Sequence, residues 1–343
     1  MTAVVPYDSR VAQGLEEDAA PPVSSIDDLR PVTRTGPRIL AMTAYAVLLA
    51  TYSHLLGIPN DTISVFVWLW LGTIAWHVES PWRYHLRFVR DWSIPMVGLI
   101  IYFYSRGLTD NLGWATVHYS MPIQFDELVS RLTGGGEHTL PTERLQHALC
   151  GDPCLRESDP RWYDIFFTTV YASHFLTGLT IAAVLWIRKR EEWLLWMRRY
   201  IAINFGALVV YIFYPMAPPW MASEDGYIRE AIPRLTGRGW RDLGLGRFDL
   251  VLQGVGNPVA AMPSLHAGIT FLVAMYGIWR LRTPFRFLLV LYPLAMSTAL
   301  VYYGEHYVVD VLAGGVLAGL VMAGCRLWER RRAREGVVDD FTG

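Results

Sequence analysis

Two short histidine-containing segments stand where polar loops meet long apolar runs. The first is Met-Pro-Ser-Leu-His-Ala at positions 262–267, and the second is Gly-Glu-His-Tyr-Val-Val-Asp at positions 304–310. In the second segment His306 and Asp310 are four residues apart, and a helical turn of about 3.6 residues places them on one face. A carboxylate there can accept the N–H of one imidazole nitrogen and leave the other nitrogen neutral and nucleophilic. This spacing predicts a nucleophilic histidine at position 306.

The first segment supplies complementary groups. Pro263 suits the first position of a helix, and Ser264 with the backbone N–H groups of a helix N-terminus predicts an anion-binding site. His266 follows within that helix and has no carboxylate of its own. Two histidines, a carboxylate and an anion site are the groups that phosphoryl transfer requires.

The elements that position these groups are predicted to be membrane helices. The chain has 343 residues, of which 52% are hydrophobic, and it contains 14 tryptophans. Several apolar runs reach about 20 residues, the length that crosses a bilayer as a helix. We therefore predict an all-α, polytopic transmembrane bundle of about eight spans, at residues 38–57, 61–79, 91–107, 165–187, 196–215, 262–281, 285–302 and 305–326.

Basic residues predict the orientation of these spans. Every second connection is short and rich in arginine, which is typical of the cytoplasmic side. Both termini are then cytoplasmic, whereas segments 108–164 and 216–261 and both histidines face outward from the cell membrane. The arginines and the lysine that carry this prediction are Arg83, Arg87, Arg90, Arg188, Lys189, Arg190, Arg198, Arg199, Arg280, Arg282, Arg286, Arg326, Arg330, Arg331, Arg332 and Arg334.

The chain divides by composition into five parts. Residues 1–37 are polar, have no apolar signal-peptide core, and are expected to form a disordered cytoplasmic tail. Residues 38–107 form the N-terminal membrane helices, and 108–164 an extracytoplasmic segment. Residues 165–326 form the catalytic core, followed by a short cytoplasmic tail at 327–343.

Within the extracytoplasmic segment, an apolar helical stripe is predicted either to lie on the outer leaflet or to pack on the bundle. Its members are Phe125, Leu128, Val129 and Leu132. Cys150 and Cys154 are predicted to form a small-loop disulfide, because this segment faces an oxidising compartment. Cys325, at the cytoplasmic end of the last span, is expected to be a buried thiol.

Other polar residues near the same membrane face have two interpretations. Tyr171 and His174 lie in the outer half of the fourth span, where polar groups serve either a site or helix packing. Trp220 follows the prolines that end the fifth span. The outer loop carries arginines that either bind anionic headgroups or are solvated: Arg229, Arg234, Arg238, Arg241 and Arg247. In the last span, small residues predict close helix packing, namely Gly314, Gly315, Ala318 and Gly319.

Taken together, the motifs resemble the type 2 phosphatidic acid phosphatase superfamily, and within it the inositol phosphorylceramide synthase branch. The resemblance lies in the Pro-Ser-Leu-His-Ala-Gly run at 263–268, the Pro-Pro-Trp at 218–220, the Tyr-x2-His-Phe at 171–175 and the His306-x3-Asp310 pair. It covers roughly residues 160–326.

This resemblance implies roles for the singled-out residues. His306 would attack phosphorus and form a phosphohistidine-type intermediate, and Asp310 would hold its tautomer. His266 would protonate the leaving oxygen and then deprotonate the incoming hydroxyl or water. Binding of substrate or phosphate would fall to Ser264, His174, Tyr171 and Trp220.

Two phosphate-binding cations of the wider superfamily are missing. Its phosphatases have a Lys-x6-Arg-Pro motif, whereas the one lysine here, Lys189, is on the predicted cytoplasmic side. They also have an arginine six residues before the second histidine, where this chain has Leu300. The synthase branch lacks the same residues, so the departure favours that branch and leaves open which side chains replace them.

The sequence thus predicts an inositolphosphotransferase-like enzyme acting on a phospholipid or a polyprenyl-type lipid phosphate at the outer leaflet. The main alternative is a lipid phosphate phosphatase. A metal hydrolase using His174, His266, His306 and Asp310 is a further alternative, as is a haem-binding or transport bundle. We expect membrane lipids as partners and no cofactor, metal or nucleic acid.

Overall fold

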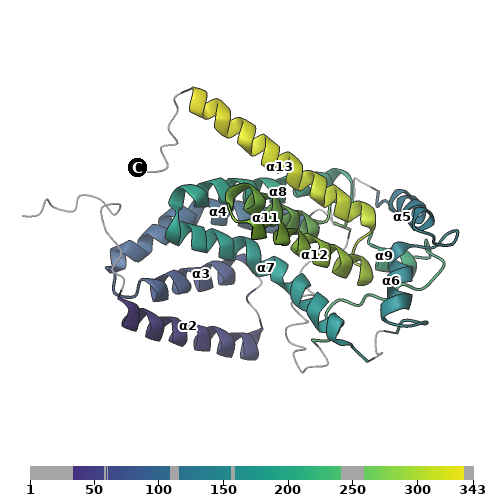
Figure 1. The fold of residues 1–343 in the computed structure, drawn as a ribbon, viewed down its shortest axis with the longest axis horizontal. Coiled ribbons are helices and arrows are strands. Elements are labelled where there is room, and N and C mark those ends of the chain that lie inside the picture. Colours follow the sequence, from purple (N-terminus) through teal and green to yellow (C-terminus); the bar gives the residue numbers. More distant parts are fainter. Residues whose placement is uncertain are drawn as a thin grey trace, which may run out of the picture.

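All regular elements that the computed structural model describes are helices (Figure 1). It describes residues 34–57, 59, 61–108, 116–155, 159–240 and 259–335. The helices are α2 (Thr35–Leu56), α3 (Thr62–Trp76), α4 (Trp82–Leu108), α5 (Ser120–Leu132), α6 (Pro141–Leu149), α7 (Trp162–Arg188), α8 (Arg190–Phe213), α9 (Pro219–Glu224), α11 (Leu265–Arg280), the 3-10 helix η3 (Pro284–Val290), α12 (Leu291–Tyr302) and α13 (Val308–Arg334). The all-α fold class is confirmed.

A helix occurs at each of the eight predicted spans. Four helical segments of the described chain are long and apolar enough to cross a membrane: α2, α7, residues 284–302 and α13. The apolar helix α3 is shorter. The count of eight spans and the cytoplasmic placement of the termini therefore remain predictions. Most residues of the predicted terminal tails, 1–33 and 336–343, lie outside the described residues.

Helix ends differ from the predicted spans because hydropathy follows the membrane, whereas a helix continues into polar sequence. Helix α4 begins at Trp82 rather than 91, since Arg83, Arg87 and Arg90 are compatible with helix. Pro293 lies in the first turn of α12, where a proline removes no intrahelical hydrogen bond.

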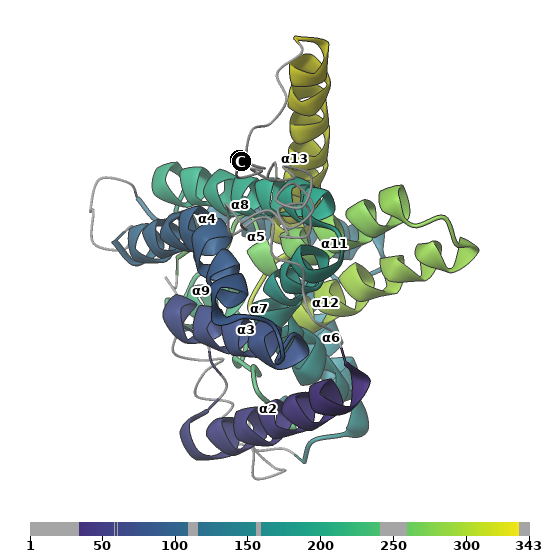
Figure 2. The same ribbon diagram turned by 90° about the vertical axis from the view of Figure 1, so that its left-hand side faces the viewer.

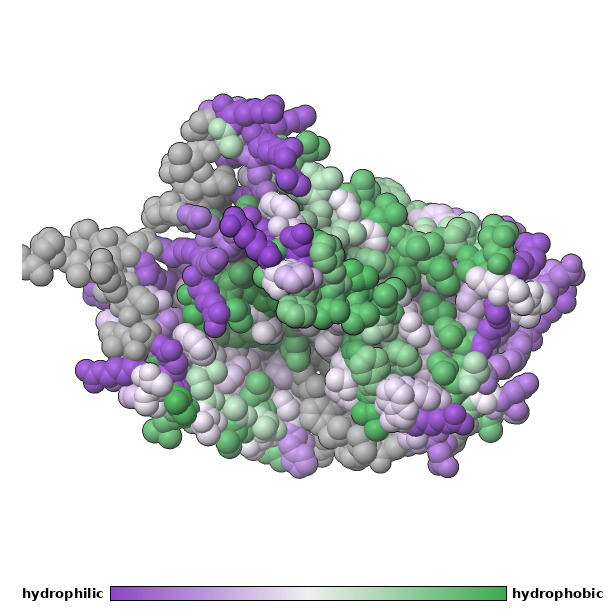
Figure 3. All heavy atoms as spheres, viewed as in Figure 1, coloured by the Kyte–Doolittle hydropathy of each residue, from purple (hydrophilic) through white to green (hydrophobic). Residues whose placement is uncertain are grey.

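The bundle has its two outermost helices on opposite sides. In Figures 1 and 2, α2 and α13 lie at opposite margins, with α7 and α11 between them. Helices α5, α6 and α9 gather at one end of the bundle. Hydrophobic side chains cover the middle of the face in Figure 3, and hydrophilic side chains gather toward its two ends. This distribution is the one expected of a bundle that crosses a membrane along its long axis.

Helices α11 and α13 approach closely because both have glycine at their contact. A Cβ atom on Gly314 would lie 2.4 Å from the Ser264 carbonyl oxygen, and one on Gly268 would lie 3.3 Å from the Gly314 carbonyl oxygen. A Cβ on Gly315 would lie 3.3 Å from the Phe271 ring. The packing role predicted for Gly319 is wrong, because open space surrounds the position that a Cβ would take there.

The segment predicted to be extracytoplasmic packs on the bundle by an unexpected face of α5. In α5 the buried residues are Pro122, Asp126 and Ser130, whereas Leu128 and Leu132 of the predicted apolar stripe are exposed. The predicted disulfide between Cys150 and Cys154 is present. Cys325 is only half-buried, so the burial predicted for it is wrong.

Candidate active site

The predicted pair of His306 and Asp310 is formed, on a backbone that differs from the predicted helix. His306 Nδ1 lies 3.3 Å from Asp310 Oδ2, and the Asp310 side chain is fully buried. Helix α13 begins only at Val308, so His306 lies before it, in the turn that follows Gly304 at φ +72°. The Tyr307 N–H also donates to Asp310 Oδ2, at 2.9 Å. The carboxylate thus fixes both the imidazole and the start of the helix, and directs His306 Nε2 away from itself.

A second carboxylate, Asp126 of α5, caps the same helix from outside the catalytic motif. The N–H groups of Val308 and Val309 donate to its two oxygens at 3.0 and 3.3 Å. Asp126 is fully buried, and burial raises its pKa to about 7, with the nearby Asp310 charge adding to the effect. Sequence reasoning missed this residue, because its partners are more than 180 residues away.

Ser264 forms the N-cap of α11 and connects it to α13. Its Oγ accepts the Ala267 N–H at 3.3 Å, and its own N–H donates to the Asp310 carbonyl oxygen at 3.0 Å. Pro263 therefore precedes the cap, and its predicted place at the first helical position is wrong because the helix begins at Leu265. The close approach at Gly314 makes this link between the two histidine segments sterically feasible.

His266 lies among aromatic rings contributed by α7. Its ring stacks on Tyr171 at 4.6 Å between centroids and lies 4.1 Å from the His174 ring and 5.7 Å from the Phe175 ring. The His306 ring is 6.0 Å away. The structure therefore brings Tyr171, His174, His266 and His306 together, so a single phosphoester can contact both of the last two.

Trp220 adjoins the His306 turn by its backbone. Its N–H donates to the Gly304 carbonyl oxygen at 3.2 Å. The guanidinium of Arg234 lies 5.0 Å from the Trp220 ring centroid and forms an ion pair with Glu305 at 2.7 Å. Thr236 Oγ1 donates to the same carboxylate. Trp220 thus helps to hold Arg234 and Glu305 beside His306.

The other outer-loop arginines have separate outcomes. Arg238 is buried, forms an ion pair with Asp164 at 3.2 Å and donates to the Leu155 carbonyl oxygen, so it holds the loop to α7. Arg229 is exposed. Arg241 and Arg247 lie outside the described residues.

A cation that sequence reasoning missed is Arg106, in the last turn of α4. It lines a cavity together with His174 and Phe175, and its guanidinium is 5.9 Å from the Tyr211 ring centroid. It is close enough to Tyr171, His174 and His266 to act on each electrostatically. The signal was present in the sequence, because a charged side chain inside an apolar span is a functional candidate.

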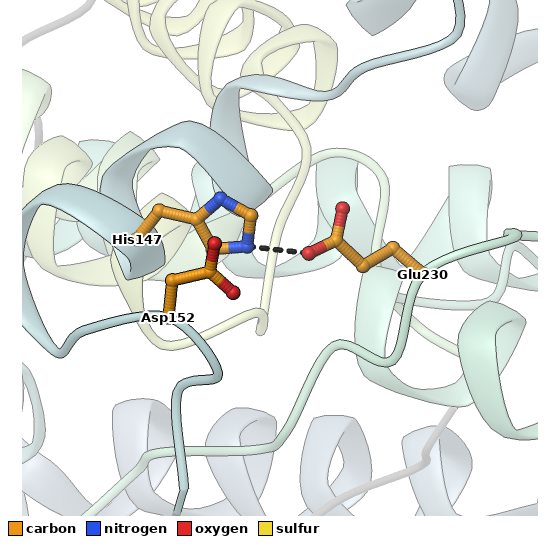
Figure 4. Close-up of side chains that lie close together, drawn as sticks. All are labelled: His147, Asp152 and Glu230. Atoms are coloured by element: carbon orange, nitrogen blue, oxygen red, sulfur yellow. Dashed lines mark ion pairs between the residues drawn. The ribbon is translucent and has the colours of Figure 1, made fainter.

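Three possible metal ligands lie apart from the histidine pair. His147 of α6, Asp152 of the disulfide loop and Glu230 each offer a ligand atom within 4.8 Å of the others (Figure 4). His147 Nε2 forms an ion pair with Glu230 Oε1. Asp152 and Glu230 are exposed, and none of the three belongs to the His174, His266, His306 and Asp310 set considered from the sequence.

Comparison with known proteins agrees with this geometry. Residues 156–324 match the model of the PAP2 superfamily, and this match includes both histidines, Asp310 and the aromatic residues of α7. The resemblance to the type 2 phosphatidic acid phosphatase superfamily is thereby confirmed.

Two curated relatives specify the branch that the chain resembles. It is 27% identical over 178 residues to a phosphoinositol dihydroceramide synthase of Bacteroides thetaiotaomicron, a match that covers 47% of this chain and 56% of the relative. It is 26% identical over 121 residues to an inositol phosphorylceramide synthase of Candida albicans, covering 34% of this chain and 26% of the relative. The chain thus spans about half of the first relative and about a quarter of the second. No solved structure matches it significantly.

Proposed function

We propose that this protein is a membrane enzyme that transfers the phospho-headgroup of one lipid to the hydroxyl of another. The observation that carries the proposal is the His306–Asp310 pair, at 3.3 Å, with the His266 ring 6.0 Å from the His306 ring. The synthase names of the two relatives support transfer of a phosphoinositol-type headgroup.

In the first half-reaction, the lone pair of His306 Nε2 attacks phosphorus and forms an N–P bond. The bond between phosphorus and the lipid alcohol oxygen breaks, and that oxygen takes a proton from His266. Asp310 stabilises the positive charge on His306, because its carboxylate accepts the Nδ1–H. The products are a phosphorylated histidine and a free lipid alcohol.

In the second half-reaction, neutral His266 removes the proton of the acceptor hydroxyl. The acceptor oxygen attacks phosphorus, the N–P bond breaks, and its electron pair returns to His306. Tyr171 stacks on His266 and holds its ring in one plane, so the same nitrogen serves as acid and then as base. The phosphoryl group leaves on the acceptor, and both histidines regain their starting states.

Transfer and hydrolysis differ in the acceptor. A lipid phosphate phosphatase is the second candidate, because water can replace the acceptor hydroxyl whenever it reaches the intermediate. The absence of the superfamily's lysine motif and the leucine at position 300 favour the synthase-like reaction.

Arg106 and Arg234 are the cations that we assign to the phosphate. Arg106 acts from α4 on the His174 and His266 side, and Arg234 acts from the outer loop on the Glu305 and His306 side. Two cations on opposite sides would offset the charge of the transferring group. Ser264, which caps α11 with its hydroxyl, would contribute through the N-terminus of that helix.

We further propose that the site faces outward from the cell membrane, with both termini in the cytoplasm. This placement rests on the arginine-rich alternate connections. Impermeant thiol reagents applied to intact cells should label single cysteines engineered into 116–119 or 225–231 and should not label one engineered at 189–191. The opposite pattern would overturn the orientation.

The reaction is tested by incubating the purified protein with a panel of lipid phosphates and phosphodiesters, each with and without a hydroxylated lipid acceptor. Mass spectrometry then compares transferred headgroup with free phosphate or free headgroup. Acceptor-dependent product supports transfer, release in its absence supports the phosphatase, and no turnover in any mixture would sink both. Chelation by EDTA should leave the rate unchanged, whereas a metal hydrolase would lose it.

A further inference from the structure

An internal cavity adjoins the catalytic histidines on the side of the N-terminal helices. It has a volume of about 110 Å³ and is bounded by α3, α4, α7, α8 and α11. At one end it is lined by Arg106, His174 and Phe175, the last two of which contact the His266 ring. The cavity therefore begins beside the proposed general acid and carries a cation there.

A second, larger cavity lies next to the first. Its volume is about 340 Å³, and its walls come from α2, α3, α7 and Pro59. Val65 and Leu179 line both cavities, so the two share a boundary. The lining of the larger cavity is mainly apolar and aromatic, with Leu49, Trp68, Leu69 and Leu176 among its members.

We propose that these two cavities form one lateral binding site for an acyl chain of the lipid whose phosphoester is cleaved. The phosphoester lies at the Arg106 and His174 end, and the chain passes Val65 and Leu179 and leaves the bundle between α2 and α7. This inference rests on the proposed function, since it assigns the substrate of the same histidines.

The lining of the two cavities changes from charged to apolar, which matches a lipid with an anionic phosphoester and a hydrocarbon chain. A cation at the inner end matches the anionic phosphoester, and apolar side chains further out match a hydrocarbon chain, which gains by leaving polar surroundings. A volume of about 340 Å³ falls within the range of small-molecule sites, about 300–1,000 Å³. Helices α2, α3 and α4 precede the segment that matches the superfamily, so selection of the lipid chain is assigned to a different part of the molecule.

The direct test is photocrosslinking, which does not depend on turnover. The full chain with His306→Ala is incubated in vesicles with an anionic phospholipid that carries a diazirine on one acyl chain, irradiated and digested. Mass spectrometry should find the label on Leu49, Leu69 or Leu176, and Arg106→Met should reduce that labelling. Equal labelling by an uncharged diacylglycerol probe would show a bulk membrane lipid only and would overturn the proposal, as would label confined to other helices.

A kinetic test uses narrowing substitutions in the otherwise native protein. Thr180→Trp narrows the larger cavity from α7, and Leu49→Trp narrows it from α2. Each should lower kcat/KM for a long-chain lipid roughly tenfold while leaving a short-chain analogue unchanged, because only the long chain needs the apolar path. Val184→Trp, on an exposed position of the same helix, is the matched control and should affect neither substrate.

Failure of this inference is distinguishable from failure of the proposed function. Equal losses on long and short chains, or no loss on either, would overturn the chain-binding site while turnover by the unmodified protein still supports the reaction. Absence of turnover with every substrate would overturn the reaction, and the crosslinking result would still decide whether the cavity binds an anionic lipid.

Discussion

The segment that matches the superfamily and the segment that precedes it contribute different things to one site. Residues 156–324 supply the two histidines, Asp310 and the aromatic rings that contact His266. The described residues before it supply Arg106, the cap Asp126 and part of the walls of the two cavities. We thus assign bond making and breaking to the shared segment, whereas the preceding segment adds a second cation, a helix cap and part of the chain-binding site.

This division indicates which properties of the protein a family match can predict. The match supports a reaction type, because the side chains to which we assign the reaction lie within it. It says little about the lipid, because two walls of the proposed lipid site belong to helices outside it. Variants in the two segments should therefore fail in different ways.

The largest expected effect is in the shared segment. His306→Ala and His306→Gln should abolish turnover of every substrate, because neither can form the N–P bond. His266→Ala should lose about 10²- to 10⁴-fold on lipids, the usual range for a general acid, and retain measurable activity on an aryl phosphate ester with a good leaving group. Steady-state rates on both substrates check this, and equal losses for both histidines on both substrates would refute the division of roles.

Asp310→Asn, also in the shared segment, should cause a similarly large loss of activity. It should fold normally yet lose most activity, because an amide of the same shape mis-sets the tautomer of His306. Thermal unfolding in detergent monitors the fold independently of rate. A fully active Asp310→Asn variant would show that the pair is not a catalytic dyad.

A smaller loss of activity is expected for Arg106, which lies in the segment that precedes the family match. Arg106→Met should raise KM or lower kcat by a combined factor of about 10 to 100, the value of a charge-assisted hydrogen bond of roughly 1.5–3 kcal/mol. Arg106→Lys should recover part of it. Arg83→Met, at the exposed other end of α4, is the matched control. If the two methionine variants are equally active, Arg106 does not bind the phosphate.

A smaller effect is expected at Asp126. Asp126→Asn replaces a carboxylate that accepts two N–H groups of α13. It should lower the rate about fivefold, since loss of a cap costs about 1 kcal/mol and shifts the start of the helix. Glu127→Gln, the next residue of α5, should change the rate little. Equal rates for both variants would mean that the cap does not position Asp310.

The raised pKa of Asp126 also predicts how the free energy of unfolding depends on pH. The pKa of Asp126 is raised to about 7, so between its ordinary value near 4 and pH 7 the folded protein holds a proton that the unfolded chain has released. The stability contributed by protonated Asp126 is therefore fully present below about pH 4 and is lost as the pH rises to about 7. Above about pH 7 this group makes the stability no longer depend on pH. Thermal unfolding from pH 4.5 to 8 should show this slope in the wild type and a flatter one in Asp126→Asn.

The smallest effect is expected at the disulfide. Cys150→Ser should change activity little, because the bond closes a loop of three residues and modest stabilisation is expected. Cys325→Ser is the control for loss of a thiol. A tenfold or larger loss of activity specific to Cys150→Ser would show that the loop positions catalytic groups.

Spacing alone predicted that His306 and Asp310 would pair, and their contact at 3.3 Å confirms the pairing. The His306 and Asp310 interval and the Pro-Ser-Leu-His run are local patterns, and local patterns survive changes in helix ends. The pairing holds even though His306 lies before the helix, because the Asp310 side chain reaches back over the first turn.

Arg106 and Asp126 could not be found in the same way. The partners of Asp126 come from a distant helix, and no interval in the sequence relates them. Arg106 stands inside an apolar run, and the rule that singled out His174 applies to it equally. Pro263 was misplaced because Ser264 can cap only the helix that begins after it.

The cap provided by Asp126 also has a consequence for the order in which α5 and α13 are synthesised and docked. A ribosome makes α5 long before α13, so under the proposed topology the carboxylate is already on the outer side when Val308 and Val309 arrive. Under the proposed function, a nascent chain that stops before position 304 would carry the proposed acid, His266, but not the proposed nucleophile, His306. Catalytic competence would then arise late in biosynthesis, when α13 docks onto a cap made some 180 residues earlier.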